Sequence, residues 1–159
     1  MAVADLIGAA VGVMLLVIVA YLLVGSTLST AEIVTNAQKA AALQEQTQLR
    51  TDFTIGDVAW DGSNINCTIN NTGKEIISDF KHMDVIVYSP SAGYQVYPYS
   101  SATEVVPGTW RIISKGQEII HPSELDPGET YRILIEINGD APAWFQITTG
   151  NGVYDSRLL

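Results

Sequence analysis

The side chains in this chain of 159 residues that most directly suggest nucleophilic or acid–base catalysis are its single cysteine, Cys67, and its two histidines, His82 and His121. A nucleophilic site places Ser, Cys or Thr beside a base, and the two histidines are the candidate bases. Cys67 alternates with Ile65 and Ile69, so we expect it to face a core, where a free thiol is inert packing. His82 and His121 lie on separate segments. The sequence therefore predicts no catalytic residue and a protein that is not an enzyme.

Metal-ligating side chains are not spaced as metal sites require. The histidines form neither H-x-H nor H-x-x-x-H, and the sequence contains no D-x-D-x-D-G loop. A single Ca²⁺ site on the loops that carry Asp126, Glu129 or Asp140 remains an open alternative. The sequence also lacks the glycine-rich motifs that bind phosphates, so we predict no metal and no cofactor.

The charge balance excludes a further class of function. The chain has 8 Lys and Arg against 17 Asp and Glu, a net charge of -9, which disfavours binding to nucleic acid. Residues 53–159 alone hold 13 acidic and 6 basic side chains, a net charge of -7. This part is expected to present an acidic surface, which suits a cationic partner, divalent ions or a salty medium, or which serves solubility alone.

An apolar segment at the N-terminus has the length of a membrane span. The sequence has no charge between Asp5 and Glu32, and the apolar run from Leu6 to Gly25 matches a hydrocarbon core of about 30 Å as a helix. The first basic residue is Lys39, so the basic region of an ordinary secretory leader is missing. The roughly 130 remaining residues are too few to bury such a helix. We expect it to span a membrane or to pack in a filament core.

Small residues on this helix predict a packing face. Gly8 and Gly12 form G-x-x-x-G, which allows a neighbouring helix to approach closely. The carboxylate of Asp5 is costly in lipid unless it lies at the interface or meets a cation, so it is either a helix-packing residue or an interfacial one.

The helix is predicted to continue to about Arg50 and to be followed by an all-β domain, an α+β fold. The domains are residues 1–51, a transmembrane or filament-core helix with its stalk, and residues 52–159, a β-sandwich. Period-two alternation and turn residues indicate seven or eight short strands, typical of an immunoglobulin-like sandwich. The expected strands are Phe53–Trp60, a strand around Ile65–Ile69, Met83–Tyr88, Tyr94–Tyr99, Trp110–Ser114, Gln117–His121, Tyr131–Ile137 and Ala143–Thr149.

Two N-glycosylation sequons start at Asn66 and Asn70. Because the two positions differ by an even number of residues, both amides should lie on the outward face of one strand. If this part of the chain lies outside the cytoplasm, an oligosaccharide there would leave the core intact.

Tyrosines cluster in one segment at Tyr88, Tyr94, Tyr97 and Tyr99. Tyrosine is enriched where a surface contacts a partner, so Tyr94, Tyr97 and Tyr99 are candidates for a partner surface. Strand alternation could equally bury two of the four.

An apolar N-terminal helix with an acidic residue at position 5, followed directly by an all-β domain, resembles the archaellum group of archaeal type IV filament proteins. The segments that support the resemblance are MAVADLIGAAVGVMLLVIVAYLLVG, Asn70–Gly73, Met83–Val87 and Leu125–Glu129 with the alternating Ile133 and Ile135. The group contains the archaellins, which build the filament, and the archaellum accessory proteins F and G.

The resemblance implies two structural roles. In archaellins and adhesive pilins a signal peptidase removes a basic leader, and the acidic residue near position 5, matched here by Asp5, eases packing of the filament core. The basic leader is absent here, which departs from that pattern. Proteins F and G are implied to lie between membrane and surface layer, as a stator against which the motor turns.

We therefore predict a membrane-anchored β-sandwich that links motor or filament to the surface layer. The alternative is a filament-forming archaellin or pilin-like subunit, and a cell-surface binding receptor is a third class. The expected partners are copies of the chain or related subunits through the N-terminal helix, the surface-layer protein and the lipid membrane. The expected location is the envelope of an archaeon, with the sandwich outside the cytoplasm.

Overall fold

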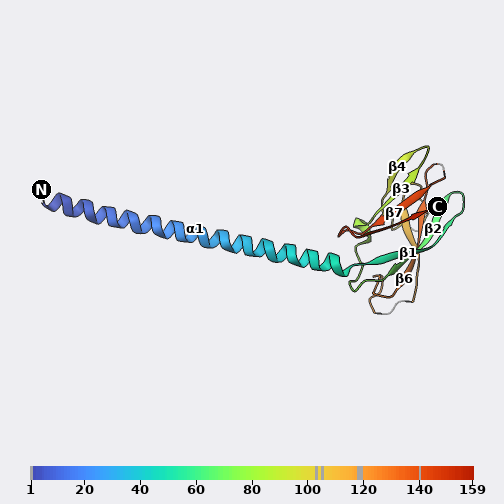
Figure 1. Ribbon diagram of the computed structural model, residues 1–159, viewed down its shortest axis with the longest axis horizontal. Coiled ribbons are helices and arrows are strands. Elements are labelled where there is room, and N and C mark those ends of the chain that lie inside the picture. Colours follow the sequence, from blue (N-terminus) through green and yellow to red (C-terminus); the bar gives the residue numbers. More distant parts are fainter. Residues whose placement is uncertain (1, 103, 105, 118–119, 140) are drawn as a thin grey trace. The chain divides into compact units, whose positions relative to one another are not determined.

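The computed structural model describes residues 2–102, 104, 106–117, 120–139 and 141–159. It contains one long helix, α1 (Ala2–Arg50), followed by two four-stranded sheets (Figure 1). The chain divides into two compact units within α1, one up to Leu43 and the other Gln44–Leu159. The last turns of the helix therefore belong to the same compact unit as the sheets.

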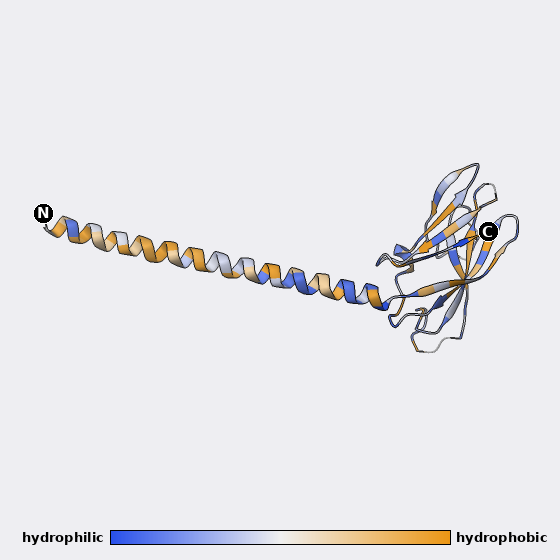
Figure 2. Ribbon diagram, in the orientation of Figure 1, coloured by the Kyte–Doolittle hydropathy of each residue, from blue (hydrophilic) through white to orange (hydrophobic). Residues whose placement is uncertain are grey.

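Helix α1 is apolar in its N-terminal part and more hydrophilic toward its C-terminal end (Figure 2). It is long and apolar enough, by length and composition, to cross a membrane. Every side chain from Val3 to Arg50 is exposed. Three hydroxyl groups donate hydrogen bonds back to carbonyls of the same helix, Thr27 to Val24 at 2.9 Å, Thr30 to Ser26 at 2.9 Å and Thr35 to Ala31 at 2.8 Å. These hydroxyls therefore need no outside partner in an apolar environment.

The two sheets are antiparallel throughout and share one core. Their strand orders are β1-β2-β6-β5 and β4-β3-β7-β8. Side chains from both sheets, such as Ile65, Ile133, Val85 and Phe145, pack into a single hydrophobic cluster. The predicted α+β fold with a β-sandwich is confirmed. The strands are β1 (Phe53–Trp60), β2 (Asn64–Asn71), β3 (Asp84–Ser89), β4 (Gly93–Tyr97), β5 (Trp110–Lys115), β6 (Thr130–Glu136), β7 (Trp144–Thr148) and β8 (Tyr154–Leu158), with a short 3-10 helix, η1 (Phe80–His82).

Strand β8 was not predicted from the sequence because charged residues occupy its inward positions. Asp155 and Arg157 point toward β1 of the other sheet. The Asp155 carboxylate accepts a hydrogen bond from the Ile55 amide at 2.8 Å, and the Arg157 guanidinium donates to the Ile55 carbonyl at 2.8 Å. These contacts join the two sheets along one side, where an apolar pair would otherwise be expected.

The prediction of a strand at Gln117–His121 is wrong for its described residues. Gln117, Ile120 and His121 are not in a strand, and residues 118 and 119 lie outside the described residues. His121 is instead turned toward Asp126, whose carboxylate accepts hydrogen bonds from both its backbone amide and its ring.

A tight junction joins the end of α1 to the sandwich. The Gly73 amide donates to the Asp52 carbonyl at 2.9 Å, and the Lys74 amide donates to the Arg50 carbonyl at 2.8 Å. A Cβ on Gly73 would lie 2.4 Å from the Asp52 amide nitrogen and 2.7 Å from the Arg50 carbonyl oxygen. The backbones can therefore approach this closely only because residue 73 has no side chain.

Replacing Gly73 by alanine should lower the stability of the sandwich by about 2–3 kcal/mol, because the added Cβ would overlap two backbone atoms. The measurement is the urea unfolding transition of the full chain in detergent micelles, followed by tryptophan fluorescence. Gly25→Ala is the matched control, since a Cβ there meets nothing within 4 Å. Equal stability of G73A and G25A would contradict the close approach described.

Candidate functional site

The residues predicted to pack against a neighbouring helix lie in the first three turns of α1. Gly8 and Gly12 stand one turn apart on the same side of the helix, and a Cβ at either position would meet no atom within 4 Å. Asp5 lies in the first turn. This stretch of α1 is exposed and could contact a partner helix. That Asp5, Gly8 and Gly12 pack closely against one stays a prediction.

The residues considered for catalysis do not come together. Cys67 is buried on the inner side of β2, and burial raises the pKa of its thiol to about 12, which keeps it protonated and unreactive. His82 pairs with Asp79 at 2.7 Å and His121 pairs with Asp126 at 2.9 Å. Among the described residues no group of three or more His, Cys, Asp or Glu side chains is placed to hold a metal ion.

The carboxylates considered for a Ca²⁺ site are engaged within their own turn. Asp126 accepts hydrogen bonds from the His121 amide and ring, both at 2.9 Å. Glu129 accepts one from the Asp126 amide at 3.0 Å. Both carboxylates are buried, so they stabilise the turn rather than face solvent. Asp140 lies outside the described residues.

The buried side chain of Asn71 connects the two turn motifs noted in the sequence. Its amide group donates to the carbonyls of Glu75 at 2.9 Å and Leu125 at 2.8 Å, and its side-chain oxygen accepts from the Gly73 amide at 3.0 Å. The Asn71 backbone also bonds to Gly128 and Glu129. The Asn70–Gly73 and Leu125–Glu129 segments therefore form one hydrogen-bonded unit beside the end of α1.

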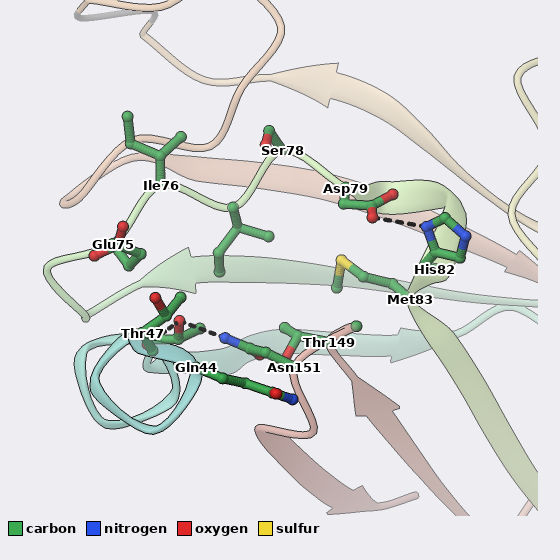
Figure 3. Close-up of a pocket in the computed structure, with 13 residues that line it drawn as sticks. Gln44, Thr47, Glu75, Ile76, Ser78, Asp79, His82, Met83, Thr149 and Asn151 are labelled. Atoms are coloured by element: carbon green, nitrogen blue, oxygen red, sulfur yellow. Dashed lines mark hydrogen bonds and ion pairs between the residues drawn. The ribbon is translucent and has the colours of Figure 1, made fainter. Parts of the chain in front are cut away.

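A pocket of about 590 Å³ lies next to this junction (Figure 3). Its polar lining groups largely pair with one another or with neighbours, as in the ion pairs of Asp79 with His82 and of Glu75 with Arg50. Asn151 donates to the Thr51 hydroxyl at 2.7 Å. The pocket is a groove with a paired polar lining rather than an assembled catalytic site. It is lined by Gln44, Thr47, Thr51, Glu75, Ile76, Ile77, Ser78, Asp79, His82, Met83, Thr149, Gly150 and Asn151.

The sequon asparagines lie on the outward side of the β1-β2-β6-β5 sheet. Asn66 is half-buried in the middle of β2 and pairs with Leu134, whereas Asn70 is exposed and accepts a hydrogen bond from the Thr130 hydroxyl. The cross-strand neighbours of Asn70 are the polar residues Thr54 and Thr130, whereas those of Asn66 are Ala59 and Leu134. Glycosylation at these positions stays a prediction.

The tyrosines expected at a partner surface occupy different environments. Tyr97 is only 2% exposed and belongs to the core, because it lies on the inner side of β4, so its assignment to a partner surface is wrong. Tyr99 is half-buried and packs against the core beside Trp110. Tyr94 is 73% exposed and lies on the outer side, with Tyr88 as its cross-strand neighbour.

Comparison with known proteins identifies the family. Residues 4–156 match the archaeal-type flagellin family, which covers nearly the whole chain. The chain belongs to this family. The archaeal-type flagellin match confirms the resemblance to archaellum proteins. A related sequence, an uncharacterized protein of Archaeoglobus fulgidus, is 31% identical over 146 residues, which cover 89% of this chain and 86% of that protein.

Solved structures share the fold of this archaeal-type flagellin family member. The archaellum periplasmic stator protein FlaG from Sulfolobus acidocaldarius has a TM-score of 0.52 at 22% identity, over 69% of this chain and 99% of that chain. A chain of the archaellum periplasmic stator complex of FlaF and FlaG from the same organism has a TM-score of 0.51 at 21% identity, over 67% of this chain and 87% of that chain.

Two features of the site were not found from the sequence. The pocket is lined by three segments that are far apart in the chain, and no local pattern signals such a meeting. The role of Asn71 was also missed, although strand alternation marks it, because Asn71 continues the inward positions of Ile65, Cys67 and Ile69 and so places a polar side chain in the core.

The His121–Asp126 pair predicts a pH dependence of stability. The hydrogen bond to Asp126 raises the pKa of His121 above its ordinary 6.5, and the same contact lowers the pKa of Asp126 below its ordinary 3.8. The contribution of His121 to the stability of the folded state is complete below pH 6.5 and is lost as the pH rises through the raised pKa. The carboxylate contribution is complete above pH 3.8 and is lost as the pH falls through the lowered pKa.

The melting temperature of the wild type should therefore decrease as the pH is raised from about 6 to about 9. It should change less in His121→Gln, because glutamine cannot be protonated. His82→Gln is the control, because it removes the other histidine and leaves the His121–Asp126 pair intact. A slope that persists in H121Q and disappears in H82Q would contradict this assignment.

Proposed function

We propose that this chain is a non-enzymatic structural component of the archaellum machinery. In this proposal the Leu6–Gly25 segment of α1 anchors the protein in the membrane, and the sandwich lies outside the cytoplasm. There it links the motor or the filament to the surface layer, in the manner of a stator. The proposal draws most strongly on one observation, the shared fold with a protein described as an archaellum stator over 99% of that protein's length.

Two features of the chain support an anchored load-bearing role. The apolar part of α1 is exposed along its length and needs a membrane or other helices to cover it. The end of the same helix is bonded to the sandwich through Gly73 and Lys74, so there is a direct covalent and hydrogen-bonded route for force. A stator resists torque through many such contacts and requires no turnover.

A filament subunit is the second candidate. The family match starts at residue 4, inside α1, and the exposed Gly8 and Gly12 would suit close packing of identical helices in a fibre core. In that case Asp5 would be a residue of the filament core.

Shearing of surface filaments from the source cells separates the two candidates. The stator proposal predicts that this chain stays with the cell envelope while filaments are released, as judged by mass spectrometry of both fractions. An abundant filament protein and an integral membrane protein of the same cells serve as markers for the fractions. Purified full chain should then bind surface-layer protein.

Recovery of this chain as a major component of sheared fibres would overturn the stator role and favour the filament subunit. Recovery in neither the envelope nor the fibres would contradict both candidates.

A further inference from the structure

Two asparagine–glycine pairs occur in the sandwich, Asn138–Gly139 and Asn151–Gly152. Asparagine is one of the thermolabile residues of proteins. Its side-chain amide can be attacked by the backbone nitrogen of the next residue, and a following glycine shields that nitrogen least, because it has no Cβ and adopts many backbone conformations. Both pairs share this local chemistry, so a difference in their reactivity must come from the folded structure around them.

The Asn138–Gly139 pair follows β6 and is open to solvent. Both residues are exposed, and Gly139 has a φ of 138°, in the region that favours glycine. A Cβ on Gly139 would meet no atom within 4 Å. Among the described residues, nothing forms a hydrogen bond with the Asn138 side chain or with the Gly139 amide. The attacking nitrogen and the amide that it would attack are therefore both accessible to water.

The Asn151–Gly152 pair is held by three hydrogen bonds. The Asn151 side-chain nitrogen donates to the Thr51 hydroxyl at 2.7 Å, and its side-chain oxygen accepts from the Thr149 hydroxyl at 2.5 Å. The Gly152 amide donates to the Thr149 carbonyl at 2.9 Å. The nitrogen that would attack is therefore engaged, and the side-chain amide is fixed. Reaction at this pair requires the local structure to open first.

We propose that Asn138 is a site of spontaneous deamidation in the folded protein, from which Asn151 is protected. The Gly139 nitrogen loses its proton to solvent and bonds to the side-chain carbonyl carbon of Asn138. The bond from that carbon to the amide nitrogen breaks, and the nitrogen takes up a proton and leaves as ammonia. Water then opens the cyclic imide at either carbonyl, which gives aspartate or isoaspartate. The reaction consumes water alone and needs no oxidant or reductant.

The modified site lies at the end of the sandwich away from α1. Strand β1 begins beside the end of α1 and runs to Trp60, and the Ile137 amide donates to the carbonyl of Ser63 in the turn after β1 at 3.1 Å. Deamidation of Asn138 adds one negative charge there, which changes the net charge of residues 53–159 from -7 to -8. This end of the sandwich therefore becomes more acidic as the protein ages, whichever structural role the chain has.

Protection of Asn151 preserves a contact with the end of α1. Its side-chain nitrogen joins the turn between β7 and β8 to Thr51, whose own hydroxyl donates to the Thr47 carbonyl at 2.9 Å. Deamidation would replace this donor with an acceptor and so remove the bond to Thr51. The same three bonds that support the junction therefore keep this asparagine intact.

Incubation of the folded full chain in mildly alkaline buffer tests the proposal. The chain is held in detergent micelles in water labelled with heavy oxygen, so that aspartate formed during the incubation carries the label. Pepsin digestion in acid and tandem mass spectrometry then read the two asparagines separately. Asn138→Gln is the matched control, because it removes the reactive amide at this position and leaves the other pair unchanged.

Asn138 should convert about a hundredfold faster than Asn151, because each ordinary hydrogen bond corresponds to about a fivefold factor and three must open together. In urea the two pairs should convert at similar rates. Comparable rates in the folded chain would overturn the proposal, and so would a difference that persists in urea, since the local sequence would then set the rates. An Asn138 that stays intact in the folded chain but converts in urea would overturn it too.

Thr51→Val tests the cause of the protection. The substitution removes one hydrogen-bond partner of Asn151 with little change in side-chain shape, and circular dichroism checks the fold. Conversion of Asn151 should become about fivefold faster, and conversion of Asn138 should be unchanged. Equal rates of Asn151 conversion in T51V and the wild type would overturn the role assigned to these bonds.

Discussion

The close approach of Gly73 to the backbone of residues 50–52 is the contact on which the rest of the architecture depends. It lets the Asn71–Gly73 turn bond to the end of α1 through the carbonyls of Arg50 and Asp52. On the other side of the same turn, the Asn71 side chain donates a hydrogen bond to the carbonyl of Leu125. This bond fixes the segment that leads into β6. One turn therefore connects the helix to β2 and β6, which are the two central strands of the first sheet.

This junction joins the helix to the sandwich without a flexible linker. The polypeptide needs only two residues to pass from the end of α1 at Arg50 to the start of β1 at Phe53. A side chain at position 73 would push the turn away and leave the end of α1 held by the chain alone. The paired polar lining of the nearby pocket, with Glu75 bonded to Arg50, adds further contacts at the same end of the sandwich.

The sandwich itself separates two kinds of surface. The outer side of the β1-β2-β6-β5 sheet carries both sequon asparagines, and the outer side of the β4-β3-β7-β8 sheet carries exposed aromatic and aliphatic side chains such as Tyr94 and Leu158. A bulky modification of Asn70 would project from the first of these two sides and would not cover the second.

Much of this architecture follows from local sequence patterns, and the parts that do not have identifiable physical reasons. The apolar run and the period-two alternation are enough to predict α1 and most strands. Strand β8 was not predicted because its inward positions hold Asp155 and Arg157. No hydropathy pattern indicates that these two side chains bond to the backbone of Ile55. Tyr97 could be assigned to the core only once the register of β4 was known. The tie between Asn71 and Leu125 spans 54 residues, and long-range pairing of this kind is not encoded in local spacing.

Hydrogen exchange of the backbone amides in the full chain tests the central role of the junction most directly. The amides of Gly73 and Lys74 lie in a turn, yet they donate to the carbonyls of Asp52 and Arg50. They should exchange as slowly as the amides of the central strands β2 and β6, because opening them requires disruption of the junction. Exchange at the rate of an exposed turn would contradict the account and would mean that α1 is joined to the sandwich by the covalent chain alone.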